Sequence, residues 1–229
     1  MSDLWLDLLP IALAMAATPG RFLALILLFH TKQAVLTSLA FVAGMASNLL
    51  IEGLAFALIF SITGVFDVEE GAGPPAILAT LFVVIGILML VGAGKMLFHK
   101  EDEDKAPPKW LAEIESFAPG KAYKLGLGWL FLSPKQWVFT LSAVAVIFAA
   151  GLDPLIALAN YLLFILIILS LFLILILSYV ILGDRSRKFM DVLLNWLKKN
   201  AMTILLVVLV VFGLYFLIKG ISALAAYNT

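Results

Sequence analysis

The chain has 229 residues, of which 64% are hydrophobic and 13% are charged, and its mean hydropathy is +1.13. Soluble proteins carry about 25% charged residues, so this composition indicates an integral membrane protein. The formal net charge of +0 excludes a strongly basic nucleic-acid binder, the absence of cysteine excludes thiol–disulfide carriers, and 2 histidines are too few for a haem or copper carrier.

Apolar segments predict six membrane-spanning helices joined by short connections. The expected helices are, in chain order, 4–29, 34–64, 76–98, 124–150, 154–182 and 201–224. Each is long enough to cross ~30 Å of hydrocarbon, which takes about 20 helical residues. Between the last two helices, residues 183–200 are predicted to form a basic linker. Asp153, in the turn before the fifth helix, is expected to cap that helix.

Basic residues fall almost entirely on one side of this six-helix plan. Of the 15 Lys and Arg residues, all but three lie in, or at the helix ends beside, the connections after the first, third and fifth helices. The exceptions are Lys219, on the other side, and Arg21 and Lys135, within helices. Because basic connections stay in the cytoplasm, this bias predicts that both termini lie outside.

Two proline turns interrupt the first and fourth helices at matched positions. The turns are Thr18-Pro19-Gly20-Arg21 and Ser133-Pro134-Lys135-Gln136. Proline breaks a helix, and an Arg or Lys inside a membrane helix costs at least about 2.5 kcal/mol. Both prolines lie ~15 Å from the cytoplasmic end of their helices, which places both breaks near the membrane midplane.

Each half has three helices, which is an odd number of membrane crossings. Two halves that share one fold must therefore run through the membrane in opposite directions. The expected fold is therefore all-α, with inverted three-helix repeats over 1–98 and 124–229. A cytoplasmic charged linker over 99–123, with a short amphipathic segment, joins them. Inverted repeats that meet at broken helices form a site that opens alternately to each side, as in secondary transporters. The alternative is that the prolines are only kinks, with the two basic residues paired to Glu52 or to backbone carbonyls.

The residues of both turns are the predicted substrate-binding residues. A freed half-helix N-terminus carries partial positive charge, to which Arg21 and Lys135 add full charges. Such a site favours an anion, such as a carboxylate, a sulfate, a phosphate or an acidic headgroup. Thr18 and Ser133 are expected to cap the half-helices that follow them.

Glu52 is the only acidic residue well inside a predicted helix. Gly44 and Asn48 precede it at intervals of four residues, so all three lie on one helix face. A stripe of small and polar residues suits either a helix interface or a water-filled path. Glu52 and Asn48 are therefore candidates for balancing the basic residues, or for exchanging a proton that couples transport.

The two breaks resemble motifs of the LysE superfamily of transporters, which has a Pro-Gly break in its first span and an Asn-Pro-Lys type motif in its fourth. Within that superfamily, stretches 19–28, 39–44, 125–128 and 133–136 are similar to the GAP family of peptidoglycolipid-addressing-protein-like transporters. The resemblance implies a multi-pass exporter in a prokaryotic plasma membrane, with an amphipathic, lipid-linked or glycolipid substrate. Ser133 replaces the Asn, and Arg21 replaces the second Pro of the amino-acid exporters, so the specificity of those exporters is not implied.

Two other functions stay open on the sequence. One is a membrane scaffold or assembly factor of a larger export system. The other is a membrane enzyme that processes lipid phosphates, but without an obvious nucleophile–base pair or metal cluster in the sequence we expect no enzyme. Neither a metal ion nor another cofactor is expected. The expected partners are membrane lipids and a small-molecule or lipid substrate, with a homodimer left open and nucleic acid excluded.

Overall fold

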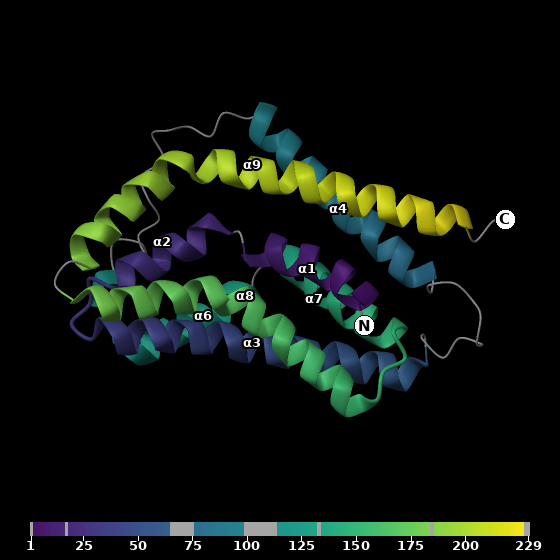
Figure 1. Ribbon diagram of the computed structural model, residues 1–229, viewed down its shortest axis with the longest axis horizontal. Helices are drawn as coiled ribbons and strands as arrows, with labels where there is room; N and C mark the ends of the chain where they lie inside the picture. Colours follow the sequence, from purple (N-terminus) through teal and green to yellow (C-terminus); the bar gives the residue numbers. More distant parts are fainter. Residues whose placement is uncertain are drawn as a thin grey trace.

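The structure is a computed structural model that describes residues 2–16, 18–64, 76–98, 114–131, 134–183 and 186–226. Within these ranges the chain forms helices and no strand. Figure 1 shows an elongated bundle in which most helices follow the long axis. The elements are, in chain order, α1 (Ser2–Ala16), α2 (Pro19–Leu28), α3 (Ala34–Thr63), α4 (Ala76–Phe98), the short 3₁₀ helix η1 (Ile114–Ser116), α6 (Pro119–Phe131), α7 (Pro134–Ala149), α8 (Pro154–Leu182) and α9 (Ser186–Ala226).

Four helices are long and apolar enough to cross a membrane alone, namely α3, α4, α8 and the Met202–Ala225 part of α9. α1 and α2 pass the same test together as one span, bent by 55°, which gives up to five spans among the described residues. These helices make the chain a multi-pass membrane protein. The predicted fourth span corresponds to α6 and α7, and residues 132–133 between them lie outside the described residues.

The first break has the predicted position but not the predicted cap. α2 begins at Pro19, whose fixed φ suits the first position of a helix. Thr18 has extended backbone and makes no side-chain cap hydrogen bond. Its hydroxyl donates instead to the Met15 carbonyl oxygen, at 3.2 Å. That carbonyl would normally accept from the backbone N–H of residue 19, which proline lacks, so the freed acceptor in α1 competes with the cap.

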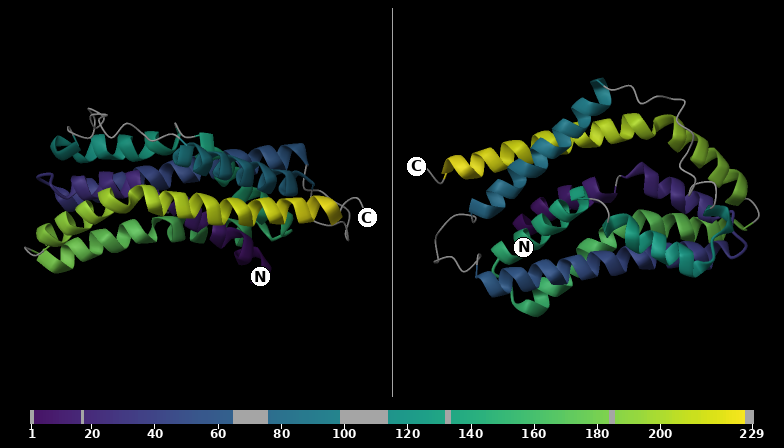
Figure 2. Two further views of the ribbon diagram at one scale, coloured as in Figure 1. Left: turned by 90° about the horizontal axis from the view of Figure 1, so that it is seen from above. Right: turned by 180° about the vertical axis from the view of Figure 1, so that it is seen from behind.

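The start of α1 and the end of α9 lie toward the same end of the bundle (Figure 1). From that end α1 and α2 lead to the far end, and α6 and α7 lead back, so the two broken segments run in opposite directions. Figure 2 shows α4 and α9 packed together along one side of the molecule, while α3 and α8 lie together on the other side. The opposite directions agree with three helices in each half.

Close backbone contacts hold α3 against α6. A Cβ at Gly44 would overlap the carbonyl oxygen of Tyr123, and a Cβ at Gly126 would overlap the carbonyl oxygen of Phe41. Each glycine therefore lies directly against the backbone of the other helix, an approach that only a residue without a side chain permits. This contact places α6, the first part of the second broken segment, beside the helix that carries Glu52.

Stacked aromatic rings join α2 to α8 toward the end of the bundle opposite the termini. The rings of Phe22 and Phe172 stack with centroids 4.5 Å apart, and those of Phe29 and Tyr179 stack at 4.4 Å. The Tyr179 hydroxyl also donates to the Phe29 carbonyl oxygen, at 3.3 Å. These side-chain contacts join α2 to α8.

The last helix is longer than predicted. α9 begins at Ser186, where the sequence predicted a basic linker up to residue 200. Residues 186–200 contain no Gly or Pro, and they include Arg, Lys, Leu and Met, which favour helices. The charged residues therefore show where the apolar part of α9 begins, but the helix itself begins earlier, at Ser186. The start of α9 reaches the end of α2, where Asp191 Oδ1 lies 3.3 Å from His30 Nε2.

The predicted linker over 99–123 is also partly helical. Residues 99–113 lie outside the described residues, but η1 follows them, and α6 begins at Pro119 rather than at residue 124. Proline is well suited to the first position of a helix, where no N–H is needed, and this moves the start of the fourth predicted helix toward the N-terminus.

Asp153 caps α8 as predicted, because its Oδ1 accepts a hydrogen bond from the Leu155 backbone N–H at 2.9 Å. Asp153→Ala is expected to lower the free energy of unfolding by about 1 kcal/mol, whereas Asp153→Asn, which can still cap, is expected to change it by less. Thermal unfolding in detergent measures both variants. Equal losses in the two would mean that the cap does not stabilise α8.

Candidate functional site

One buried hydrogen bond connects the two breaks. Arg21 Nη2 donates to Gln136 Oε1 at 2.8 Å, and Arg21 Nη1 donates to the Met15 carbonyl oxygen at 3.3 Å. Arg21 is 4% exposed and Gln136 is 2% exposed. Arg21 thus uses one nitrogen for the carbonyl that Pro19 leaves unpaired, and the other for the start of α7. The side chain fixes both breaks relative to each other.

Arg21 and Gln136 hold the same place in their turns, because each is the second residue after the proline. They are 115 positions apart, which is also the separation of Pro19 and Pro134. In a twofold arrangement, a residue contacts its own equivalent only close to the axis. This contact therefore joins equivalent positions of the two turns.

A buried carboxylate lies on α3. Glu52 is 5% exposed, and its Oε2 accepts a hydrogen bond from the Thr140 hydroxyl on α7, at 2.9 Å. Glu52 and Arg21 interact electrostatically, but these two side chains, both described, form no direct ion pair. Asn48, one turn before Glu52, is 1% exposed. All three positions of the predicted stripe on α3 are buried, with Gly44 at the contact with α6.

Several polar atoms of this region have no hydrogen-bond partner among the described residues. They are Arg21 Nε, Gln136 Nε2, Glu52 Oε1, and both polar side-chain atoms of Asn48. Most buried polar groups are paired, because leaving one unpaired costs about 1–3 kcal/mol. Spare donors and acceptors gathered beside two helix breaks are suited to a polar ligand. We refer to Arg21, Asn48, Glu52, Gln136 and Thr140 as the polar cluster.

The other predicted binding residues are only partly described. Ser133 lies outside the described residues, as do the side chains of Pro134 and Lys135, although the backbone of α7 begins at Pro134 as predicted. Gly20 faces the indole ring of Trp129 on α6, and a Cβ there would lie 3.3 Å from that ring. Gly20 therefore lets the first break approach the helix that precedes the second.

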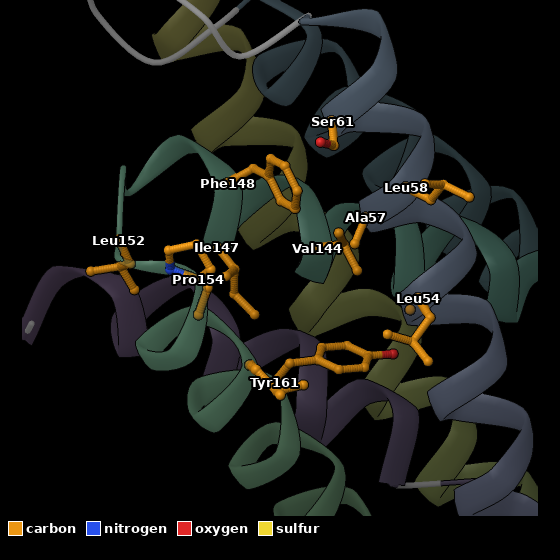
Figure 3. A pocket seen from close by; sticks show the side chains of 13 residues that line it. Leu54, Ala57, Leu58, Ser61, Val144, Ile147, Phe148, Leu152, Pro154 and Tyr161 are labelled. Carbon is orange, nitrogen blue, oxygen red and sulfur yellow. The ribbon is translucent and has the colours of Figure 1, made fainter.

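An apolar cavity of about 570 Å³ lies next to the polar cluster, between α3, α7 and α8. No pattern in the sequence predicted this cavity. Figure 3 shows Val144, Ile147 and Phe148 of α7 along one wall and Leu54, Ala57 and Leu58 of α3 along another. Figure 3 also shows the Tyr161 ring reaching from α8 toward α3 at one end of the cavity. The lining side chains are almost all apolar.

Tyr161 forms the wall between the cavity and the polar cluster. Its hydroxyl donates to the Leu49 carbonyl oxygen at 2.6 Å, and its ring lies against Gly53, where a Cβ would overlap it. Gly53 follows Glu52 directly, and Tyr161 interacts electrostatically with that carboxyl group. Tyr161 therefore lies between the apolar cavity and Glu52 of the polar cluster. This arrangement suits a molecule with both an apolar and a polar part.

A family model described as Sap, sulfolipid-1-addressing protein, matches residues 8–222. The match includes both breaks, the polar cluster and the cavity. It confirms the predicted resemblance to a GAP-like family, while the relation to the wider LysE superfamily stays a prediction. No curated protein and no solved structure matches the chain.

Proposed function

The chain belongs to the Sap, sulfolipid-1-addressing protein family, and from this premise we propose that it exports an anionic, amphipathic lipid or glycolipid. The family indicates a role in lipid export or addressing. Secondary transport by alternating access, with substrate bound where the two breaks cross, is the more specific part of the proposal. We place the protein in a prokaryotic plasma membrane with both termini outside, in accordance with the bias of its basic residues.

The observation that carries this proposal is the buried hydrogen bond between Arg21 and Gln136. A buried guanidinium at the N-terminus of a half-helix attracts an anion, because charge and helix dipole have the same sign. Arg21 Nε and Gln136 Nε2 remain as donors without a partner among the described residues. An anionic headgroup would accept hydrogen bonds from both. Glu52 would either balance the charge of Arg21 when the headgroup leaves, or carry the proton that couples transport.

Alternating access is supported by the way in which the two halves meet. Matched residues contact each other at the crossing, and the two broken segments run in opposite directions. The two halves also contact each other through α3 with α8 and through α4 with α9, which correspond in an inverted repeat. We therefore propose an inverted repeat in which the halves exchange conformations.

The test of this function is transport by the purified protein in vesicles. The wild type is expected to move a fluorescent anionic lipid between leaflets, faster than it moves a zwitterionic lipid with the same tails. In Gln136→Glu, the new carboxylate pairs with Arg21 and neutralises it, so transport is expected to fall by about tenfold or more while the protein stays folded. Gln136→Met, which adds no charge, is the matched control. Equal transport by the wild type and Gln136→Glu would contradict the anion site.

The scaffold function is the second candidate, because the name of the family describes addressing and not transport. A scaffold would restore lipid export in cells that lack the protein but would move no lipid in vesicles of purified protein. Under that function, Gln136→Glu would support cellular export as well as the wild type does. Comparison of the two assays therefore separates an exporter from an assembly factor.

A further inference from the structure

The cavity between α3, α7 and α8 has an edge that faces the bilayer. Leu54 and Leu58 of α3 and Leu158 of α8 line it, and they are 59%, 61% and 42% exposed. Because both helices are apolar enough to span the membrane, exposed leucines on them contact lipid. The inner wall carries Val144 and Ile147, each 4% exposed. The cavity therefore extends from the lipid into the protein.

The size and lining of the cavity fit a hydrocarbon chain. A methylene group takes about as much space as a molecule of liquid water, ~30 Å³, so about 570 Å³ holds one acyl chain of ordinary length. Tyr161 lines the cavity, donates its hydroxyl to the Leu49 carbonyl oxygen about one turn before Glu52, and interacts electrostatically with the Glu52 carboxyl group. A lipid whose chain lies in the cavity has its polar end near the charged residues.

We propose that this cavity is the tail site of the transported lipid, and that one acyl chain enters it sideways from the bilayer between α3 and α8. The inference rests on the proposed function and adds to it the place of the tail and the route of entry. Lipid tails are as apolar as leucine side chains, so moving a chain from the bilayer into the cavity gains little free energy. Recognition therefore comes from the headgroup, and the cavity keeps the tail in apolar surroundings while the headgroup reaches Arg21.

Photolabelling tests the tail site directly. The full-length protein is placed in nanodiscs of phosphatidylcholine containing phosphatidylglycerol with a diazirine on one acyl chain, and the labelled residues are identified by mass spectrometry. Labels on Val144 and Ile147 are expected, since bulk lipid does not reach side chains that are 4% exposed. Labels only on outward-facing residues such as Leu162 and Leu166, which are 46% and 53% exposed, would show bulk lipid alone and overturn the proposal.

Matched tryptophan variants provide the control. Ala57→Trp fills the cavity, whereas Ala55 is exposed on the same helix and does not line the cavity. Labels on Val144 and Ile147 are expected to be lost in Ala57→Trp and kept in Ala55→Trp; labels that persist in both would overturn the proposal. If the first pair does not fold, the same comparison is made on α8. There Ala157→Trp fills the cavity, and Ala159→Trp, at an exposed position that does not line it, is the control.

The transport assay separates this proposal from the function on which it rests. A wild type that moves lipid in vesicles but is not labelled at Val144 or Ile147 is still an exporter, and only the tail site is wrong. A wild type that is labelled there but moves no lipid has the tail site, and only the exporter function is wrong.

Discussion

Arg21→Gln and Glu52→Gln are each expected to lower the free energy of unfolding by about 1–3 kcal/mol, and the double variant is expected to lose less than the sum of the two single losses. Both residues are buried, at 4% and 5% exposure, and their charges interact. Removal of one charge leaves the other without compensation in the interior. Removal of both leaves neutral amides, whose burial costs much less.

Denaturant titration in detergent measures the free energy of unfolding of the wild type, the two single variants and the double variant. Vesicle transport by the same proteins separates stability from function. The double variant is expected to be folded but unable to transport an anionic lipid, because the guanidinium is absent. Asp7 and Lys219, a pair between α1 and α9 whose side chains are 20% and 34% exposed, serve as the control. Lys219→Gln is expected to cost about 1 kcal/mol or less. If the losses of Arg21→Gln and Glu52→Gln simply add, the two charges do not compensate each other.

Gly126→Ala is expected to lower the free energy of unfolding by about 3 kcal/mol, while Gly128→Ala, two residues later in α6, is expected to leave it unchanged or slightly higher. A Cβ at Gly126 would overlap the Phe41 carbonyl oxygen, so α3 and α6 would have to separate. At Gly128 a Cβ would meet nothing within 4 Å among the described residues, and alanine favours the helix more than glycine does.

Thermal unfolding of purified protein in detergent measures the two glycine variants. Gly44→Ala, on the other side of the same contact, is expected to behave like Gly126→Ala because its Cβ would overlap the Tyr123 carbonyl oxygen. Equal melting temperatures for Gly126→Ala and Gly128→Ala would mean that α3 and α6 adjust to a methyl group, and that the close contact is not required.

Features with a local cause could be predicted from the sequence. Pro19 lacks an N–H and Gly20 follows it, so this pair predicts the break between α1 and α2, whereas Pro10 alone lies inside α1 without ending it. Asp153 caps α8 through a neighbour two residues away. The cap predicted for Thr18 was wrong because the carbonyl of Met15, freed by the same proline, lay within reach of its hydroxyl.

Features that depend on how helices meet could not be predicted in detail. The sequence predicted that Arg21 would pair with Glu52 or with carbonyls if the breaks were only kinks; it pairs with one carbonyl and with Gln136. Gln136 was assigned to the site without a partner, because no local pattern shows which side chain faces it. The cavity has no signal in the sequence, since apolar periodicity predicts that Val144 and Tyr161 are buried but not that space remains between them.

The stacked rings between α2 and α8 give the two ends of the bundle different roles. In the proposed repeat α2 corresponds to α7 and α3 to α8, so Phe22, Phe29, Phe172 and Tyr179 fill the counterpart of the open cavity. In the proposed alternating access, these stacked rings would close the far end of the bundle. Each stack contributes about 0.5–1.5 kcal/mol, so breaking two costs about 1–3 kcal/mol. A difference of that size would leave about 1% to 15% of the molecules with these stacks broken at equilibrium, so a coupling energy of a few kcal/mol would be enough to change which end of the proposed site is open.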